Sequence, residues 1–271
     1  MVRFQREEDI SKWLKNRPFE ISVTIAARAA LRQLPILDYE LSCYARYNLG
    51  VAELGSALIL PTFRAVAISW AVAAYPHRIS DISSHLPKAI SSAGSAAAVH
   101  QPYPGADERA WVREGGHNLC PMSAYGAADT ARSPISAHER AATTVRNTVL
   151  GDPYVAALNP IALANSAYWT AASLDAATIE RGTTREQLIL HPLWLGEPPS
   201  QLKPHWLHLK DQLLTESEDW SVWTDWYAAR WSGNSSIEDV EFSRAAISDE
   251  IWNAGPRVLN RHIQDILDGR S

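Results

Sequence analysis

The sequence predicts an all-α protein, a bundle or array of helices with a Trp-rich helical sub-domain toward its C-terminus. Apolar residues recur at helical spacing, and no segment alternates apolar and polar residues between turn residues. Hydrophobic residues make up 46% of the 271 positions and charged residues 20%, which is typical of a chain that buries a core. The tryptophans gather in the second half, between Trp194 and Trp231.

The first predicted element is the amphipathic segment REEDISKWLKNR. Its apolar residues Ile10, Trp13 and Leu14 share one helical face, and acidic residues occupy its first turn, where they complement the helix dipole. Pro18 follows directly and ends the helix, since proline cannot continue the hydrogen-bond ladder.

The next elements are rich in small residues. A helix through EISVTIAARAALRQL stops before Pro35, because the residue preceding a proline avoids the helical region. Its alanines allow a neighbouring helix to approach closely. Helices are also predicted over 38–60 and 62–75, with a break between them, and over 78–99, with a weak centre at Gly94.

Residues 100–134 form the most irregular stretch, punctuated by prolines and glycines, and only ADERAWVRE within it has a helical pattern. A connection of this length is either a functional loop or a boundary between sub-domains, and the boundary is favoured. The chain then divides into a small-residue half, 1–134, and a Trp-rich acidic half, 135–271. One continuous domain is the alternative.

The charge balance changes near the same position. Residues 1–135 carry 14 Lys and Arg against 12 Asp and Glu, whereas residues 136–271 carry 11 against 18. Because no basic stripe is present, nucleic acid is not expected as the main ligand. The acidic half is explained by a solvated surface, and a basic partner is the alternative.

The sequence gives no sign of a membrane span or a secretory leader. The most apolar stretch, 57–75, is interrupted by Pro61 and Arg64, and the N-terminal residues are charged where a signal peptide turns apolar. A cytoplasmic protein is expected. Cys43 and Cys120 lie far apart in the chain, outside any metal or redox spacing, so they are expected to be reduced thiols.

The second half has clear helix punctuation. Asn159 and Pro160 predict a helix start, and Gly182 lies just past the corresponding end. Thr183 and Glu186 have the spacing of a capping box for a short helix. Further helices are predicted for HWLHLKDQLL, for residues 236–247 and for PRVLNRHIQDIL.

The segment EDWSVWTDWYAARWSG, residues 218–233, is predicted to be a helix with Ser217 as its N-cap. Glu218 and Asp219 then occupy the first turn, and Ser232 and Gly233 close the other end. At about 100° per residue, four aromatic side chains fall within a stripe roughly 80° wide. The stripe consists of Trp220, Trp223, Tyr227 and Trp231.

Trp226 lies on the flank of this stripe, and Arg230 follows one turn later, close enough to stack on its indole. A helix that buries its aromatic face is the favoured interpretation, with acids in neighbouring turns accepting from the indole N–H groups. An interaction edge built on Trp226 and Arg230 is the first alternative. A ligand cage or glycan platform is the second, and it requires several rings exposed together.

Sequence signatures of catalysis are weak. The chain has no Gly-rich phosphate loop and no G-x-S-x-G elbow, and no catalytic residue or cofactor is predicted. His205 and His208 stand at i and i+3 and are weak candidates for metal ligands. His117 and Cys120 have the residue types of a nucleophile–base pair or of two zinc ligands, without a further ligand at a diagnostic spacing.

The block D-W-x-V-W-x-D-W-Y-x-x-R, which begins at Asp219 and ends at Arg230, resembles a C-terminal block of uncharacterised bacterial proteins that are Ala-rich and helical. The segments IAARAALRQLP and PLW at 192–194 are similar to the same family. The likeness covers less than half of the chain, and residues 100–134 depart from it. It implies an all-helical fold and carries no assigned activity, so it implies no catalytic residues.

These observations favour a non-enzymatic protein-interaction or regulatory protein, with a protein partner. Homo-oligomerisation is left open. Two alternatives remain: a metal-dependent or Cys/His hydrolase that uses His205 and His208 or His117 and Cys120, and a protein that binds glycans or small ligands through exposed tryptophans.

Overall fold

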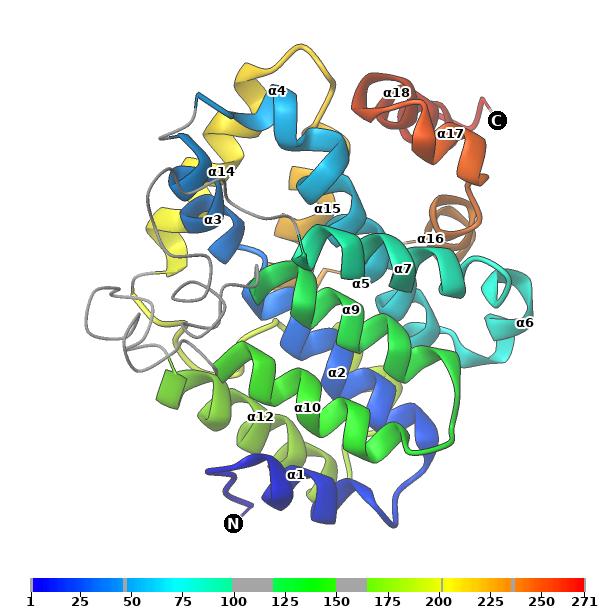
Figure 1. Ribbon diagram of the computed structural model, residues 1–271. Coiled ribbons are helices and arrows are strands. Elements are labelled where there is room, and N and C mark those ends of the chain that lie inside the picture. The colour runs from blue at the N-terminus through cyan, green and yellow to red at the C-terminus, as the bar shows by residue number, and fades with distance from the viewer. Residues whose placement is uncertain are drawn as a thin grey trace.

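The protein is described by a computed structural model that covers residues 2–45, 48–98, 119–149, 165–200, 202–234 and 237–270 (Figure 1). These residues form helices and connecting turns without a strand, so the predicted all-α fold is confirmed. The helices of the first half are α1 (Glu7–Leu14), α2 (Phe19–Gln33), α3 (Ile36–Ala45), α4 (Val51–Leu54), α5 (Leu60–Ala74), α6 (Ile79–Ile82), α7 (Leu86–Ala97) and α9 (Leu119–Arg132). Those of the second half are α10 (Ala137–Val149), α12 (Asn165–Glu180), α13 (Arg185–Leu190), α14 (Leu202–Thr215), α15 (Ser221–Ser232), α16 (Glu238–Ala245), α17 (Asp249–Asn253) and α18 (Pro256–Leu267).

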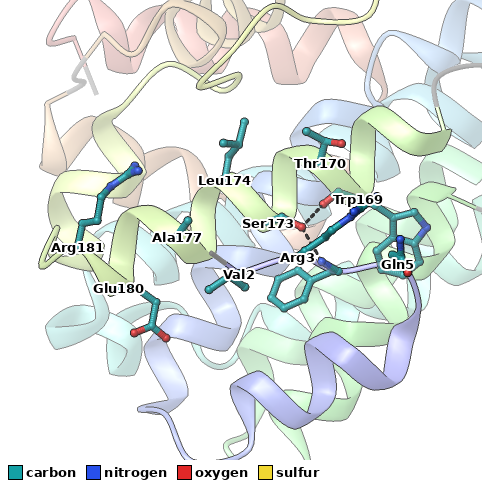
Figure 2. Close-up of a pocket in the computed structure, with 11 residues that line it drawn as sticks. Val2, Arg3, Gln5, Trp169, Thr170, Ser173, Leu174, Ala177, Glu180 and Arg181 are labelled. Atoms are coloured by element: carbon teal, nitrogen blue, oxygen red, sulfur yellow. Dashed lines mark hydrogen bonds between the residues drawn. The ribbon is translucent and has the colours of Figure 1, made fainter.

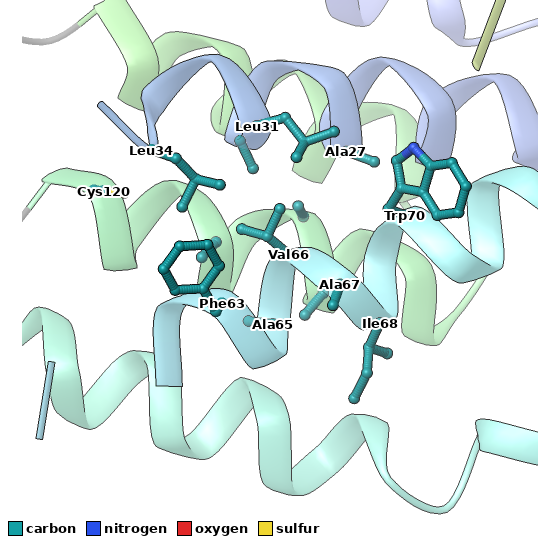
Figure 3. Packing of buried hydrophobic residues seen from close by; sticks show 14 of the residues in the cluster. Ala27, Leu31, Leu34, Phe63, Ala65, Val66, Ala67, Ile68, Trp70 and Cys120 are labelled. Carbon is teal, nitrogen blue, oxygen red and sulfur yellow. The ribbon is translucent and has the colours of Figure 1, made fainter. Parts of the chain in front are cut away.

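Helices α2, α5 and α9 pack against one another at the centre, with α7 and α10 beside them (Figures 1 and 3). The alanines of α2, including Ala26, Ala27 and Ala30, are fully buried, as the small-residue pattern predicts. Figure 3 shows Ala27 and Leu31 of α2 facing the same core as Val66 of α5. Small side chains let these helix axes approach closely, which raises the packing density of the core.

The prediction of an irregular 100–134 is wrong for its last part, because 119–132 form α9, a central helix of the core. Residues 100–118, including ADERAWVRE, lie outside the described residues. Pro121 is tolerated in α9 because it lies in the first turn, where its missing N–H has no partner to lose. A Cβ on Gly126 would lie 2.6 Å from Oγ1 of Thr144 in α10, so this glycine permits close helix packing instead of marking a loop.

Two other predicted boundaries differ from the structure. The break expected near Pro61 is absent, because a π-helical turn at Gly55–Ile59 joins α4 to α5. Such a turn shifts the hydrogen-bond register and accommodates a residue without an N–H donor. The helix predicted over 78–99 is two helices, α6 and α7, and Gly94 lies inside α7 against the ring of Tyr125.

The helical run from 51 to 74 is the one candidate membrane span among the described residues. Of its most apolar window, 89% is buried inside the protein. The core therefore already covers this apolar surface, and no clear membrane span is present in the described part of the chain.

Helices from both predicted halves pack together, since α10 contacts α2 and α9, and α14 contacts α3. A buried ion cluster reinforces this packing: Asp175 of α12 lies 3.1 Å from Arg28 and 2.7 Å from Arg32 of α2. The same arginines donate to backbone carbonyls of Pro192 and Leu193, which follow α13. The division of the chain at 134 stays a prediction.

Candidate functional site: a groove beside the buried Trp226–Arg230 cluster

Helix α15, which carries the tryptophan cluster, begins later than its sequence indicates. Asp219 has a φ of +55°, so the chain turns sharply there and the helix starts at Ser221. The prediction of Ser217 as N-cap is therefore wrong. Glu218 instead accepts a 3.1 Å hydrogen bond from the indole of Trp220. The predicted C-terminus is confirmed by Gly233, which adopts the left-handed conformation with a φ of +75°.

The predicted aromatic stripe of α15 faces the core. Trp220, Trp223 and Tyr227 are fully buried, and Trp231 is partly buried. The ring of Trp223 lies 5.1 Å from that of Phe63 in α5, and its indole N–H donates to Asn260 of α18 at 2.9 Å. The stripe thus fixes α15 against two helices from distant parts of the chain.

Trp226 and Arg230 also lie in the core, with only 4% and 5% of their surface exposed, as the favoured interpretation of a buried aromatic helix predicts. The alternative of an exposed edge is wrong for these two side chains, and a binding role for them stays a prediction. The predicted stacking is confirmed: the Arg230 guanidinium is 4.9 Å from the Trp226 ring centroid and 4.1 Å from that of Trp70 in α5. This flank of α15 is buried as well, because Trp226 packs against Phe63 of α5 and Glu241 of α16 contacts both Trp226 and Arg230.

Glu241 is the shared acceptor of this buried cluster. Its carboxylate accepts from the Trp226 indole at 2.9 Å, from Arg244 at 3.1 Å and from Arg230. Burial raises the pKa of Glu241, but the two guanidiniums outweigh burial and hold that pKa below its ordinary value.

A groove of about 340 Å³ lies beside the cluster, between α15, α16 and α18. Trp226, Arg230, Glu241 and Arg244 border its buried side. Ile237 and Leu267 stand at its outer side with 72% and 44% of their surface exposed. Asp225 also lines it, and its side chain is 74% exposed, with Lys210 at 3.6 Å. The groove therefore combines accessible apolar side chains with an accessible carboxylate.

The weak metal candidates His205 and His208 are brought together by a residue that the sequence did not single out. Their Nδ1 atoms lie 2.7 Å and 2.6 Å from the two carboxylate oxygens of Asp38, a buried residue of α3. Among the described residues, no group of three or more His, Cys, Asp or Glu side chains is arranged to hold a metal ion. The observed contacts join α14 to α3.

The second catalytic candidate is only half described, because His117 lies outside the described residues. Cys120 is buried in α9, and its backbone N–H donates to Glu40 at 2.9 Å. Burial, reinforced by the nearby Glu40 carboxylate, raises the pKa of the Cys120 thiol well above its ordinary value. The thiolate that nucleophilic chemistry requires is therefore disfavoured at neutral pH.

The described part of the chain has no tryptophan with a largely exposed side chain. Partly buried examples are Trp13, Trp169 and Trp231. A glycan platform needs several exposed rings together, and such a platform is not found among these residues.

Comparison of the chain with protein-family models, with curated proteins and with solved structures finds no match.

Sequence reasoning missed Glu241, Arg244 and Asp38. Glu241 and Arg244 stand at i and i+3 in a predicted helix, where a carboxylate and a guanidinium usually form an exposed pair. Nothing in the local sequence indicates that this pair folds onto Trp226, fifteen residues earlier in the chain.

Proposed function

We propose that this protein is a non-enzymatic interaction protein whose groove between α15, α16 and α18 binds a short basic, amphipathic segment of a protein partner. The observation that carries the proposal is that Ile237 and Leu267, two exposed apolar side chains, line a groove that Asp225 also lines. Grooves of this kind accept the apolar face of a partner helix.

The buried cluster supports this proposal by making the groove rigid. Trp226 and Arg230 are held by Glu241 and by stacking, so the groove wall needs little ordering when a partner binds. Ile237 and Leu267 supply apolar area that a partner covers. Buried apolar contacts of this kind dominate the energetics of most interfaces.

The charge of the partner follows from Asp225 and from the acidic second half of the chain. Asp225 is the accessible charged group of the groove, and residues 136–271 carry 18 acidic against 11 basic side chains. Lysine or arginine beside the apolar residues of the partner complements this field, which speeds association and makes it depend on salt.

Affinity capture from a lysate of the source organism tests the proposal with two matched pairs of variants. Ile237→Asp and Leu267→Asp place a charge in the groove. Ile135→Asp and Leu214→Asp place the same charge at equally exposed apolar side chains elsewhere, at 76% and 46% exposure. We expect one partner to be lost from both groove variants and retained by both controls, while all four remain folded by circular dichroism.

A synthetic peptide from the captured partner then tests the chemistry directly. We expect a peptide with apolar and basic residues to bind the purified protein, with at least tenfold weaker affinity for Ile237→Asp, equivalent to about 1.4 kcal/mol. Asp225→Lys should weaken binding at low salt. Equal capture of the partner by the groove and control variants would contradict the proposal, and so would a partner segment without basic residues.

A further inference from the structure

A cavity of about 1080 Å³ lies along α12 and the N-terminal segment 2–5 (Figure 2). Trp169, Ser173, Ala177 and Glu180 line it from one face of α12, at intervals of three or four residues. From Trp169 to Arg181 this face extends about 18 Å, because an α-helix rises about 1.5 Å per residue. The cavity is therefore an elongated groove.

The N-terminal segment is held in place as the second wall. The backbone N–H of Phe4 donates to Oγ of Ser173 at 2.8 Å, and this hydroxyl donates to the carbonyl of Trp169 at 2.8 Å (Figure 2). The ring of Phe4 is buried and packs edge-on against Trp13 at 5.8 Å. Contacts within the chain thus hold this wall of the groove in place, and small-molecule sites are usually largely pre-formed in this way.

Apolar side chains dominate the middle of this groove. Val2 comes from the N-terminal segment, whereas Leu174 and Ala177 come from α12. All three are only partly buried, so their apolar surface is open to an occupant. An extended hydrocarbon chain has the shape that such a groove accommodates.

The groove also carries positive charge without a matching acid. Arg3 and Arg181 line it and are exposed, and in the described ranges no carboxylate contacts either guanidinium. Arg181 donates to Oγ1 of Thr178 at 2.9 Å. The lining acid, Glu180, is already engaged, because it accepts from Trp13 at 2.9 Å and from Arg17. The unpaired charge of the groove is therefore cationic.

We infer that this groove binds a long-chain carboxylate, with the hydrocarbon chain along α12 and the carboxylate on Arg3 or Arg181. Guanidinium groups pair with carboxylates through two parallel hydrogen bonds, which suits this head group. The inference does not depend on the proposed function. The described residues that line the two grooves are different, and Figure 1 shows α12 and α18 at opposite ends of the molecule.

Displacement of fluorescent cis-parinaric acid from the purified full chain tests the inference. Palmitate is compared with hexadecanol, its uncharged counterpart, and with hexadecyltrimethylammonium, its cationic counterpart. We expect saturable binding of one palmitate per chain. Its affinity should be at least tenfold higher than that of hexadecanol, and the difference from hexadecyltrimethylammonium should be larger.

Three variants locate the site. Ala177→Phe fills the groove and should reduce palmitate affinity at least tenfold. Arg3→Gln with Arg181→Gln should remove the preference for palmitate over hexadecanol while leaving hexadecanol binding unchanged. The single Arg variants show which guanidinium holds the carboxylate. Arg261→Gln with Arg270→Gln makes the same charge change at other exposed arginines and should have no effect.

Thermal melts monitored by circular dichroism establish that each variant is folded. Absence of saturable palmitate binding overturns the inference. Equal affinity for palmitate and hexadecanol in the wild type, or unchanged palmitate binding in the folded double Gln variant, overturns it as well.

Discussion

The carboxylate of Glu241 accepts a 2.9 Å hydrogen bond from the indole of Trp226, although α15 and α16 are separate helices. The same carboxylate lies against Arg230 and Arg244, so one buried acid contacts an indole and two guanidiniums. This contact holds the Trp226 indole in the interior on the flank of the aromatic stripe. Trp226 therefore lines the buried side of the groove and is not exposed on the surface.

Glu241→Gln should destabilise the protein by about 3–5 kcal/mol, because it removes the buried carboxylate charge that Arg230 and Arg244 both contact. Urea unfolding followed by circular dichroism measures the loss. Asp225→Asn provides the control, since this exposed acid should change the free energy of unfolding by less than about 0.5 kcal/mol. A change below 1 kcal/mol for Glu241→Gln would contradict the central place of this residue.

The stability that Glu241 contributes should depend on pH. Its folded pKa lies below the ordinary value of 4.5, so the folded state favours the charged form. The contribution is therefore fully present above about pH 4.5 and is lost as the pH falls through the folded pKa. The difference in free energy of unfolding between wild type and Glu241→Gln should be constant from pH 7 to 5 and shrink below that range. A difference that grows on acidification would contradict the ion pairing.

Gly126→Ala should destabilise the contact between α9 and α10, since the new Cβ would lie 2.6 Å from Oγ1 of Thr144. Overpacking of this kind costs about 1–3 kcal/mol, and the better helix propensity of alanine offsets about 1 kcal/mol. Thr144→Ala removes the obstructing oxygen, so the double variant should be more stable than the sum of the single changes predicts. A double-mutant cycle by urea unfolding checks this coupling, and additive effects would contradict it.

Asp38→Ala should loosen α14 from α3, because Asp38 is the partner of both His205 and His208. The loss of these hydrogen bonds should cost about 1–3 kcal/mol and increase amide hydrogen exchange in α14. Asp211→Ala, an exposed acid on the same helix, serves as the control. Protection of α14 that is equal in both variants would show that the histidine contacts do not hold the helix.

Local patterns in the sequence determined the all-helical fold, the aromatic stripe of α15 and the helix ends at Gly182 and Gly233. These features depend on side-chain periodicity and on residues that tolerate positive φ, and Gly182 and Gly233 do have φ values of +95° and +75°. The capping box was predicted one residue too early, since Thr184 and Gln187 form it. Neighbouring positions there carry residues of the same capping ability, and only the backbone geometry selects one.

Tertiary structure alone decided that Gly126 belongs to a central helix, that Trp226 is buried against α5, and that Asp38 joins two histidines more than 160 residues away. A glycine that lies in a loop and a glycine that permits close packing between helices have the same local sequence signature. Likewise, a tryptophan on the flank of a stripe is exposed or buried according to which distant helix packs over it. Helical periodicity describes one element at a time, whereas burial and charge pairing depend on contacts between elements, which the spacing of residues along the chain does not encode.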